Sequence, residues 1–198
     1  MLFFPGNEGT LSKFLAQMRP WLASGFDVFM FGYRGFGKSA FRWPTEHGVR
    51  LDALGAWTYL IRGRRLQPGQ IIFYAQSLGC GVASWAAAEC SPAALILEGG
   101  FPSVNDLASR AVPWLPVKWI TTDRFDTATH LGRVACPVLV AHSTEDRQVP
   151  WAYGQRLLVA ARSPKTFLSL RGEHARALEN MPDEFMEAVI SFLSSHAA

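Results

Sequence analysis

The sequence predicts an α/β fold, in which a mostly parallel sheet of about six strands carries helices on both faces. Short apolar runs, typical of buried strands, alternate with amphipathic segments typical of helices along the whole chain. No repeat, low-complexity segment or long linker interrupts this alternation. A chain of 198 residues is long enough to bury one sizeable core. We therefore expect a single domain over residues 1–198.

The expected elements follow in order from the apolar runs and the turn residues between them. Strands are expected at residues 1–4, 26–31, 71–75, 93–97, 137–141 and 166–170. Thr10 is a suitable N-cap for a helix with apolar residues at helical spacing as far as Leu22, which Pro20 should kink or interrupt. Further helices are expected to begin at Thr45–Glu46, Gly79, Pro150 and Asn180.

Composition argues against several classes of protein. The net charge is only +3, and the basic cluster at residues 62–65 suits a helix C-terminus, so no nucleic-acid partner is expected. The three cysteines form no CxxC pair and their number is odd, which favours a reducing, cytoplasmic compartment over a disulfide framework. No apolar run approaches the ~18–20 residues that a membrane span needs, so no transmembrane segment is expected.

Residues 101–133 break the regular alternation. This stretch contains three prolines and an aromatic patch, and we expect short helices and loops laid over the sheet edge as a small, lid-like insertion. The apolar side chains that could line a substrate pocket there are Trp114, Leu115, Trp119 and Ile120. Ordinary core packing is the alternative role for these four residues.

The stretch from Ala75 to Gly79 carries the clearest chemical signal. An apolar run precedes it and a helix-like run follows, so Ser77 lies on a sharp strand-to-helix turn. Such a turn needs small residues two before and two after the serine, and Ala75 and Gly79 meet that need. This arrangement is typical of the nucleophile elbow, usually written G-x-S-x-G. Cys80 lies beside the turn, but packing is its expected role.

A serine nucleophile needs a base and an acid that orients the base, and the chain supplies both in the expected order. Asp146 follows the strand at residues 137–141, and His174 follows the strand at residues 166–170. All three candidates therefore fall just past the C-terminal ends of strands, where sites form in doubly wound sheets. The rival acids are Glu98 and Glu145, and the rival bases are His47, His130, His142 and His196.

An oxyanion hole needs two backbone N–H groups that point at the developing negative charge. The amide of Leu78, directly after the nucleophile, is the first candidate. The second is the amide of Asn7, in the loop after the first strand, because Gly6 lets the chain turn tightly there. The alternative is that residues 5–7 form only a turn.

With these residues in place, the chain resembles the α/β-hydrolase superfamily. More narrowly, it is similar to the α/β-hydrolase-domain proteins that include protein depalmitoylases and related bacterial hydrolases. The matching segments are residues 4–7 (Phe-Pro-Gly-Asn), 33–39 (Tyr-Arg-Gly-Phe-Gly-Lys-Ser), 75–79, 101–104 and 123–126, and the loops that carry Asp146 and His174. The family has His, Asp and Gly where this chain has Pro5, Gly32 and Ala75. The resemblance implies an α/β-hydrolase fold without the family's first two strands, whether as a minimal domain or as part of a chain with upstream strands or an anchor.

Residues 32–39 also fit a second pattern, the phosphate-binding P-loop G-x-x-x-x-G-K-[ST]. A P-loop runs directly into a helix whose N-terminus holds the phosphates. Here Pro44 follows soon after Lys38 and disfavours a helix at Trp43, so the next helix is expected to start afresh at Thr45. Nucleotide binding is therefore kept only as an alternative function.

The sequence as a whole predicts a serine hydrolase that cleaves a carboxylic ester or thioester through an acyl-enzyme on Ser77. The expected substrate is a small or lipid-like acyl compound, and no cofactor or metal is required. The alternatives are a P-loop nucleotide-binding protein that uses residues 32–39 and an inactive binding module that retains the fold.

Overall fold

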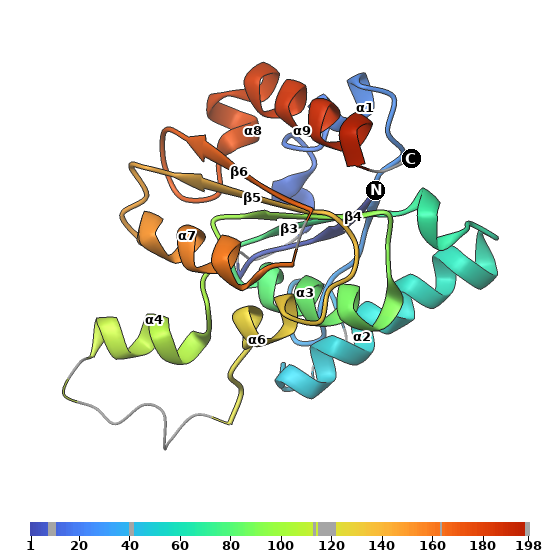
Figure 1. Ribbon diagram of the computed structural model, residues 1–198. Coiled ribbons are helices and arrows are strands. Elements are labelled where there is room, and N and C mark those ends of the chain that lie inside the picture. Colours follow the sequence, from blue (N-terminus) through green and yellow to red (C-terminus); the bar gives the residue numbers. More distant parts are fainter. Residues whose placement is uncertain (8–10, 40–41, 113, 115–121, 163, 197–198) are drawn as a thin grey trace.

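The computed structural model describes residues 1–7, 11–39, 42–112, 114, 122–162 and 164–196 (Figure 1). Its centre is a sheet with the strand order β2-β1-β3-β4-β5-β6. Every strand pairing among the described residues is parallel, so the predicted α/β fold is confirmed. The strands are β1 (Leu2–Phe4), β2 (Phe29–Met30), β3 (Ile72–Gln76), β4 (Ala94–Glu98), β5 (Val138–Ser143) and β6 (Lys165–Leu170).

Helices cover both faces of the sheet, as Figure 1 shows. Helices α1, α8 and α9 lie on one face, and helices α2, α3, α6 and α7 lie on the other. The α-helices are α1 (Arg19–Ala23), α2 (Glu46–Thr58), α3 (Gly79–Cys90), α4 (Val104–Ala111), α6 (Thr127–Leu131), α7 (Trp151–Ala160), α8 (Ala177–Asn180) and α9 (Pro182–His196). Short 3-10 helices span Leu11–Phe14 and Pro68–Gln70, and a π-helical turn spans Tyr59–Gly63.

The two layers are built by alternate residues of the same strands. In β3, Phe73 and Ala75 pack into the core under α2 and α3, while Tyr74 between them packs into the core under α9. Successive side chains of a strand point to opposite faces, and both faces of this sheet are covered. The central strands are therefore continuously apolar, and Phe73, Tyr74 and Ala75 are all fully buried.

The first helix predicted from sequence is divided in the structure. A 3-10 helix ends at Phe14, and α1 begins at Arg19, next to Pro20. Proline is tolerated in a first turn because its missing N–H would have no intrahelical acceptor there. The prediction that Pro20 interrupts the helix is thus confirmed, and Thr10 lies outside the described residues.

The second strand is shorter than the predicted range of 26–31. β2 is the edge strand and pairs only with β1. In that pairing, Phe29 and Met30 are the two residues of β2 that have partners. Phe26 instead packs edge-on against Trp21, with ring centroids 5.2 Å apart. Phe26 is therefore apolar because it packs against Trp21, although the sequence pattern had assigned it to the strand.

The segment 101–133 contains the expected short helices and loops. Ser103 caps α4 by accepting a hydrogen bond from the Asp106 amide at 3.0 Å. The Val104 amide donates to the Arg124 carbonyl at 2.8 Å, which joins the start of α4 to the stretch that precedes α6. Arg156 of α7 pairs with Asp106 at 2.8 Å, so α4 is tied to the helix layer.

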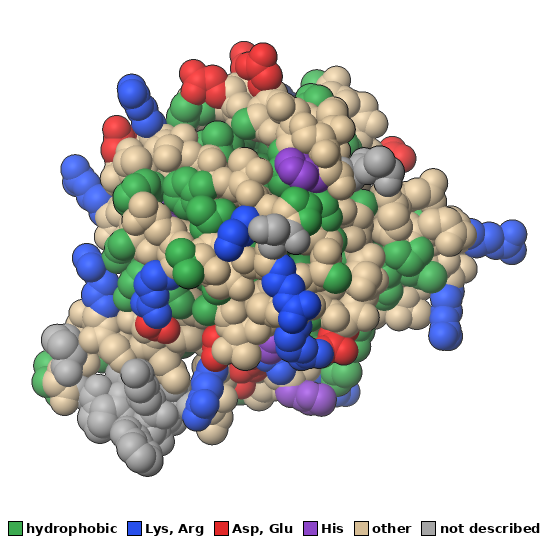
Figure 2. Space-filling model, viewed as in Figure 1, with side chains coloured by type: hydrophobic (Ala, Val, Ile, Leu, Met, Phe, Trp, Pro, Cys, Tyr) green, Lys and Arg blue, Asp and Glu red, His purple; other side chains and the backbone are tan. Residues whose placement is uncertain are grey.

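The surface drawn in Figure 2 shows Lys and Arg side chains at separate places around the outline and near the centre. No helix among the described residues is long and apolar enough to cross a membrane. The three cysteines, Cys80, Cys90 and Cys136, are free thiols.

Helix α3 approaches the end of β1 so closely that only glycine fits at its first position. A Cβ atom on Gly79 would lie 2.3 Å from the Phe4 carbonyl oxygen and 2.6 Å from the Pro5 carbonyl oxygen. Both neighbours are backbone atoms, which cannot move aside without displacing the strand. Gly79 therefore sets the distance between the turn at Ser77 and the loop after β1.

We expect Gly79→Ala to lower the free energy of unfolding by about 1–3 kcal/mol or more, because overpacking displaces backbone. Gly55→Ala in the middle of α2 is the matched control, since a Cβ there meets nothing within 4 Å. That control should gain about 0.5–1 kcal/mol from the better helix propensity of alanine. Urea unfolding measures both variants, and equal stabilities would contradict the close approach at Gly79.

Candidate active site

Ser77 lies on the turn between β3 and α3 in a backbone conformation that is rare for a residue with a side chain. Its φ angle is +52°. The Ser77 amide donates to the Glu98 carbonyl at 2.9 Å, and the Cys80 amide donates to the Ser77 carbonyl at 3.0 Å. These bonds hold the left-handed turn, which otherwise costs on the order of 1–3 kcal/mol. Such strain at a half-buried serine between a strand and a helix is the geometry expected of a nucleophile elbow.

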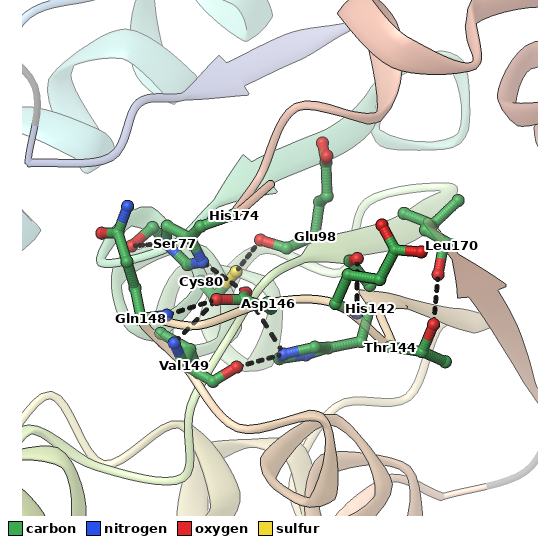
Figure 3. Close-up of polar contacts among 12 residues, drawn as sticks. Ser77, Cys80, Glu98, His142, Thr144, Asp146, Gln148, Val149, Leu170 and His174 are labelled. Carbon is green, nitrogen blue, oxygen red and sulfur yellow. Dashed lines mark hydrogen bonds and ion pairs between the residues drawn. The ribbon is translucent and has the colours of Figure 1, made fainter. Parts of the chain in front are cut away.

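His174 lies between Ser77 and Asp146, and Figure 3 shows the three side chains in a row. His174 Nε2 is 2.8 Å from Ser77 Oγ, and His174 Nδ1 is 2.6 Å from Asp146 Oδ2. Since the carboxylate can only accept at Nδ1, that nitrogen carries the proton and Nε2 is free to accept from the serine hydroxyl. The structure therefore brings together the three residues that the sequence order predicts.

The Asp146 carboxylate is held by a turn of its own loop. Its Oδ1 accepts hydrogen bonds from the amides of Gln148 at 2.9 Å and Val149 at 2.8 Å. Burial opposes ionisation, but the hydrogen bonds from His174, Val149 and Gln148 outweigh it, so the pKa of Asp146 lies below its usual value. The group stays an anion that orients His174.

The rival acids Glu98 and Glu145 support the loop of His174 and make no hydrogen bond to its ring among the described contacts. Glu98 is buried at the end of β4 and accepts from the Ala177 amide at 2.7 Å and from Gln76 Nε2 at 3.0 Å. The hydroxyl of Tyr74 also donates to it. Glu145 accepts from the Gly172 amide at 2.8 Å. Both carboxylates therefore hold backbone on either side of His174.

The rival bases are engaged elsewhere within the described structure. His142 is fully buried, its Nε2–H donates to the Val149 carbonyl at 3.0 Å, and burial lowers its pKa. Its Nε2 also lies 3.5 Å from Asp146 Oδ2, beneath the carboxylate. His130 Nε2 contacts Arg50 at 2.9 Å, and His196 Nδ1 donates to Phe192. His47 lies inside α2.

The candidate oxyanion donors lie on either side of Ser77. Leu78 directly precedes α3, where the first amides of a helix have no intrahelical acceptor. Gly6 and Asn7 line a pocket of about 170 Å³ together with Ser77 and His174. A Cβ atom on Gly6 would lie 3.3 Å from Ser77 Cβ, so the loop after β1 passes directly over the nucleophile. Leu78 and Asn7, whose amides are the candidate donors, thus both lie next to Ser77.

A cysteine nucleophile and a nucleotide-binding P-loop fit the structure less well than a serine nucleophile does. Cys80 is fully buried, and burial raises the pKa of its thiol, so it remains a protonated, packed side chain. Residues 33–39 form turns and α2 begins only at Glu46, which leaves the loop without the adjoining helix that a P-loop requires. Arg34 pairs with Asp52 at 2.7 Å and so holds this loop against α2. The described residues contain no cluster of three potential metal ligands.

The predicted pocket residues of the insertion are not found beside Ser77. Trp114 lies in a turn after α4 and its side chain is 79% exposed, so it covers neither Ser77 nor His174. Leu115, Trp119 and Ile120 lie outside the described residues. The pocket at Ser77 is lined instead by polar side chains that sequence reasoning missed, namely Gln17, Gln76, Gln148 and Arg176. Three of them lay close to predicted site residues in the sequence: Gln76 precedes Ser77, Gln148 follows Asp146 by two residues, and Arg176 follows His174 by two residues. Gln17 carried no such signal.

Comparison with known proteins identifies the family. Residues 1–136 match the family model described as the alpha/beta hydrolase fold. The chain therefore belongs to the α/β-hydrolase family, which supports a hydrolase as its function.

Relatives of known sequence agree with this assignment. An uncharacterised protein of Mycobacterium tuberculosis is 32% identical over 174 residues, which make up 87% of this chain and 62% of that protein. The lysophosphatidylserine lipase ABHD12 of Danio rerio is 31% identical in an alignment 186 residues long, which covers 84% of this chain and 48% of that protein. The latter supports the predicted resemblance to α/β-hydrolase-domain proteins. The chain spans less than two thirds of the length of either relative.

Solved structures share the fold at lower identity. A Pyrococcus furiosus esterase superposes with a TM-score of 0.77 at 16% identity, over 100% of this chain and 80% of the esterase. A structure from a study of the metagenome-derived lipolytic enzymes LipS and LipT gives a TM-score of 0.76 at 20% identity, over 98% and 93% of the two chains. At these identities the likeness concerns the fold.

We expect Glu98→Ala to lower the free energy of unfolding by about 2–4 kcal/mol, because each buried polar group left without a partner costs about 1–3 kcal/mol. The groups affected are the Ala177 amide, Gln76 and Tyr74. Glu98→Gln is the matched control, since it keeps an acceptor oxygen and the side-chain volume. Urea unfolding compares them, and equal losses in the two variants would argue against this supporting role.

Asp146 should contribute to the acid sensitivity of the protein. Its folded-state pKa is depressed, so its contribution is complete above the unfolded-state pKa of about 3.9 and is lost as the pH falls through the lower folded-state pKa. The difference in unfolding free energy between the wild type and Asp146→Asn should therefore shrink from about pH 4 towards pH 2. Urea unfolding over this range measures it, and a difference that grows on acidification would contradict the sign.

Proposed function

We propose that this protein is a serine hydrolase that cleaves a carboxylic ester or thioester through an acyl-enzyme on Ser77. The observation that carries the proposal is the continuous contact from Ser77 Oγ to His174 Nε2 and from His174 Nδ1 to Asp146 Oδ2. These distances lie within the ~2.6–3.2 Å range in which a general base can take the proton of a nucleophile.

In the proposed reaction, Ser77 Oγ attacks the acyl carbon while His174 Nε2 takes the hydroxyl proton. Asp146 keeps His174 in the tautomer with a proton on Nδ1 and stabilises the imidazolium that forms. His174 then gives its new proton to the leaving alcohol or thiol, and the carbon–leaving group bond breaks. Water, deprotonated by His174, attacks the acyl-enzyme, and the carboxylic acid leaves as Ser77 regains its proton.

The negative charge of each tetrahedral intermediate falls on the former carbonyl oxygen. We assign its stabilisation to the amides of Leu78 and Asn7, because α3 and the loop after β1 bring backbone to both sides of Ser77. Pro5 stands where the family has His. Proline lacks a backbone N–H of its own, but the amides of Asn7 and Leu78 are unaffected by this difference. A donor of this kind contributes on the order of 10²–10³ in kcat in other enzymes.

The family and one relative support the proposed substrate class. The relative from Danio rerio is named a lysophosphatidylserine lipase, which makes an ester of a lipid-like acid a suitable substrate for this chain. A thioester needs no different machinery, since the same attack at the acyl carbon releases a thiol. We therefore expect activity on simple activated esters whose acyl group can reach Ser77.

A fluorophosphonate probe should label the wild type, and Ser77→Ala should abolish the labelling. Turnover of p-nitrophenyl acetate should fall by about 10³–10⁶-fold in that variant, because the nucleophile is lost and only binding and oxyanion stabilisation remain. Ser169→Ala, on the exposed side of β6, is the matched control and should keep both labelling and turnover.

Two outcomes would overturn the proposal. Labelling that persists in Ser77→Ala would place the nucleophile elsewhere. A folded wild-type protein that resists all serine-directed probes and turns over no ester would identify an inactive binding module.

A further inference from the structure

His142 is a buried histidine that the proposed reaction does not use as a base. It lies next to the last residue of β5, and its side chain is fully buried. Burying a polar ring costs free energy unless the ring is hydrogen-bonded, so the contacts of His142 indicate what its burial achieves. Those contacts lead to the loop that carries Asp146.

The Nε2 side of the ring faces two groups of this loop, and Figure 3 shows the ring joined to both. His142 Nε2 lies 3.0 Å from the Val149 carbonyl oxygen and 3.5 Å from Asp146 Oδ2. Because a carbonyl oxygen can only accept, Nε2 carries the proton of the neutral ring. The contact with Oδ2 is too long for a good hydrogen bond, so it acts as an electrostatic attraction between the N–H group and the anion.

The two oxygens of Asp146 have different partners. Oδ1 accepts from the amides of Gln148 and Val149, at 2.9 Å and 2.8 Å. Oδ2 lies between two imidazoles, with His174 Nδ1 at 2.6 Å and His142 Nε2 at 3.5 Å. Val149 is held from both ends, since its amide donates to Asp146 and its carbonyl accepts from His142. His142 therefore favours the orientation of the carboxylate that presents Oδ2 to His174.

The other side of the ring is closed by helix α7. His142 Nδ1 is buried and has no hydrogen-bond partner among the described residues, and a Cβ atom on Gly154 would lie 2.7 Å from it. A second proton on Nδ1 would have no acceptor there, and burial lowers the pKa of His142. The ring is therefore neutral. An imidazolium at this place would compete with His174 for the Asp146 carboxylate, whereas a neutral ring leaves that charge to His174.

We propose that His142 is a positioning residue, whose neutral ring holds Val149 and the Asp146 carboxylate so that Oδ2 faces His174 Nδ1. It acts through Asp146 and contacts neither Ser77 nor His174 by a hydrogen bond among the described contacts. This assignment rests on the proposed function and adds a side chain behind the acid of the proposed proton transfer. Gly154 belongs to the same arrangement, because it leaves the space that the ring occupies.

His142→Phe removes the N–H group and keeps a ring of similar size. It should lower kcat for p-nitrophenyl acetate by about 10–100-fold, the range typical of outer-shell partners in metal sites. KM should change little, because His142 does not reach the substrate. His142→Gln is the matched variant, since a glutamine Nε2 can donate from about the place of the imidazole Nε2, and it should retain most of the wild-type kcat.

The sharpest test repeats the substitution in the Asp146→Asn background. There the carboxylate that His142 positions is gone, so His142→Phe should change the residual kcat by less than about 2-fold. A purely structural role would instead lower kcat by the same factor in both backgrounds. The comparison therefore separates an effect through Asp146 from a general loosening of the fold.

Gly154→Ala tests the same arrangement without changing His142. Its Cβ should displace the ring and lower kcat, while Gly55→Ala, where a Cβ meets nothing within 4 Å, should keep the wild-type kcat. Val189→Ala is the control for lost stability alone. Val189 is fully buried in α9 on the other face of the sheet, so this variant should unfold more easily and keep its kcat.

The outcomes distinguish this proposal from the function on which it rests. Wild-type kcat in folded His142→Phe and Gly154→Ala would overturn the positioning role and leave the serine hydrolase standing. Equal losses in the two Asp146 backgrounds, or a His142→Gln variant as slow as His142→Phe, would do the same. A wild type that neither reacts with the fluorophosphonate nor turns over any ester would instead remove the proposed function itself. Thermal unfolding of each variant shows whether a low kcat reflects misfolding.

Discussion

The turn that joins β3 to α3 is the constraint on which the site depends. Ser77 adopts a left-handed φ of +52°, and Gly79 lets α3 begin against the carbonyl oxygens of Phe4 and Pro5. A larger side chain at position 79 would push the helix away from the sheet. The Ser77 turn and the loop after β1 are consequently held together by close backbone packing, by the pairing of β1 with β3, and by the hydrogen bond from the Ser77 amide to the Glu98 carbonyl. His174 and Asp146 then lie in a row from the Ser77 hydroxyl.

Most of the fold could be predicted because the strands of a parallel sheet have a recognisable sequence pattern. Both faces of the central strands are buried, so runs such as residues 94–98 are continuously apolar and easily recognised. The order of Ser77, Asp146 and His174 along the chain was equally informative, since each follows its own strand. Edge elements were less predictable. Phe26 is apolar because of its contact with Trp21, and local periodicity cannot separate that role from strand pairing.

The lining of the candidate pockets escaped prediction for a different physical reason. A cavity is the space left between elements that are distant in sequence, so no local pattern encodes it. Leu11 and Phe36 lie on separate segments and face one space only after β1 and β2 pair. The conspicuous aromatic residue Trp114 suggested a pocket from composition alone, yet its side chain is largely exposed. The types of the residues thus predicted the kind of reaction, but they did not predict which residues line the pockets.

Glu98 has a consequence for how the site tolerates motion. Its backbone carbonyl accepts from the Ser77 amide, and its carboxylate accepts from the Ala177 amide three residues beyond His174. One residue of the central strand β4 is therefore a common anchor for both the nucleophile turn and the loop of the base. Because both attachments are to Glu98, a shift of β4 that keeps these two hydrogen bonds would move the Ser77 turn and the segment after His174 together. Ser77 and His174, the two ends of the proposed proton transfer, therefore share one anchoring residue.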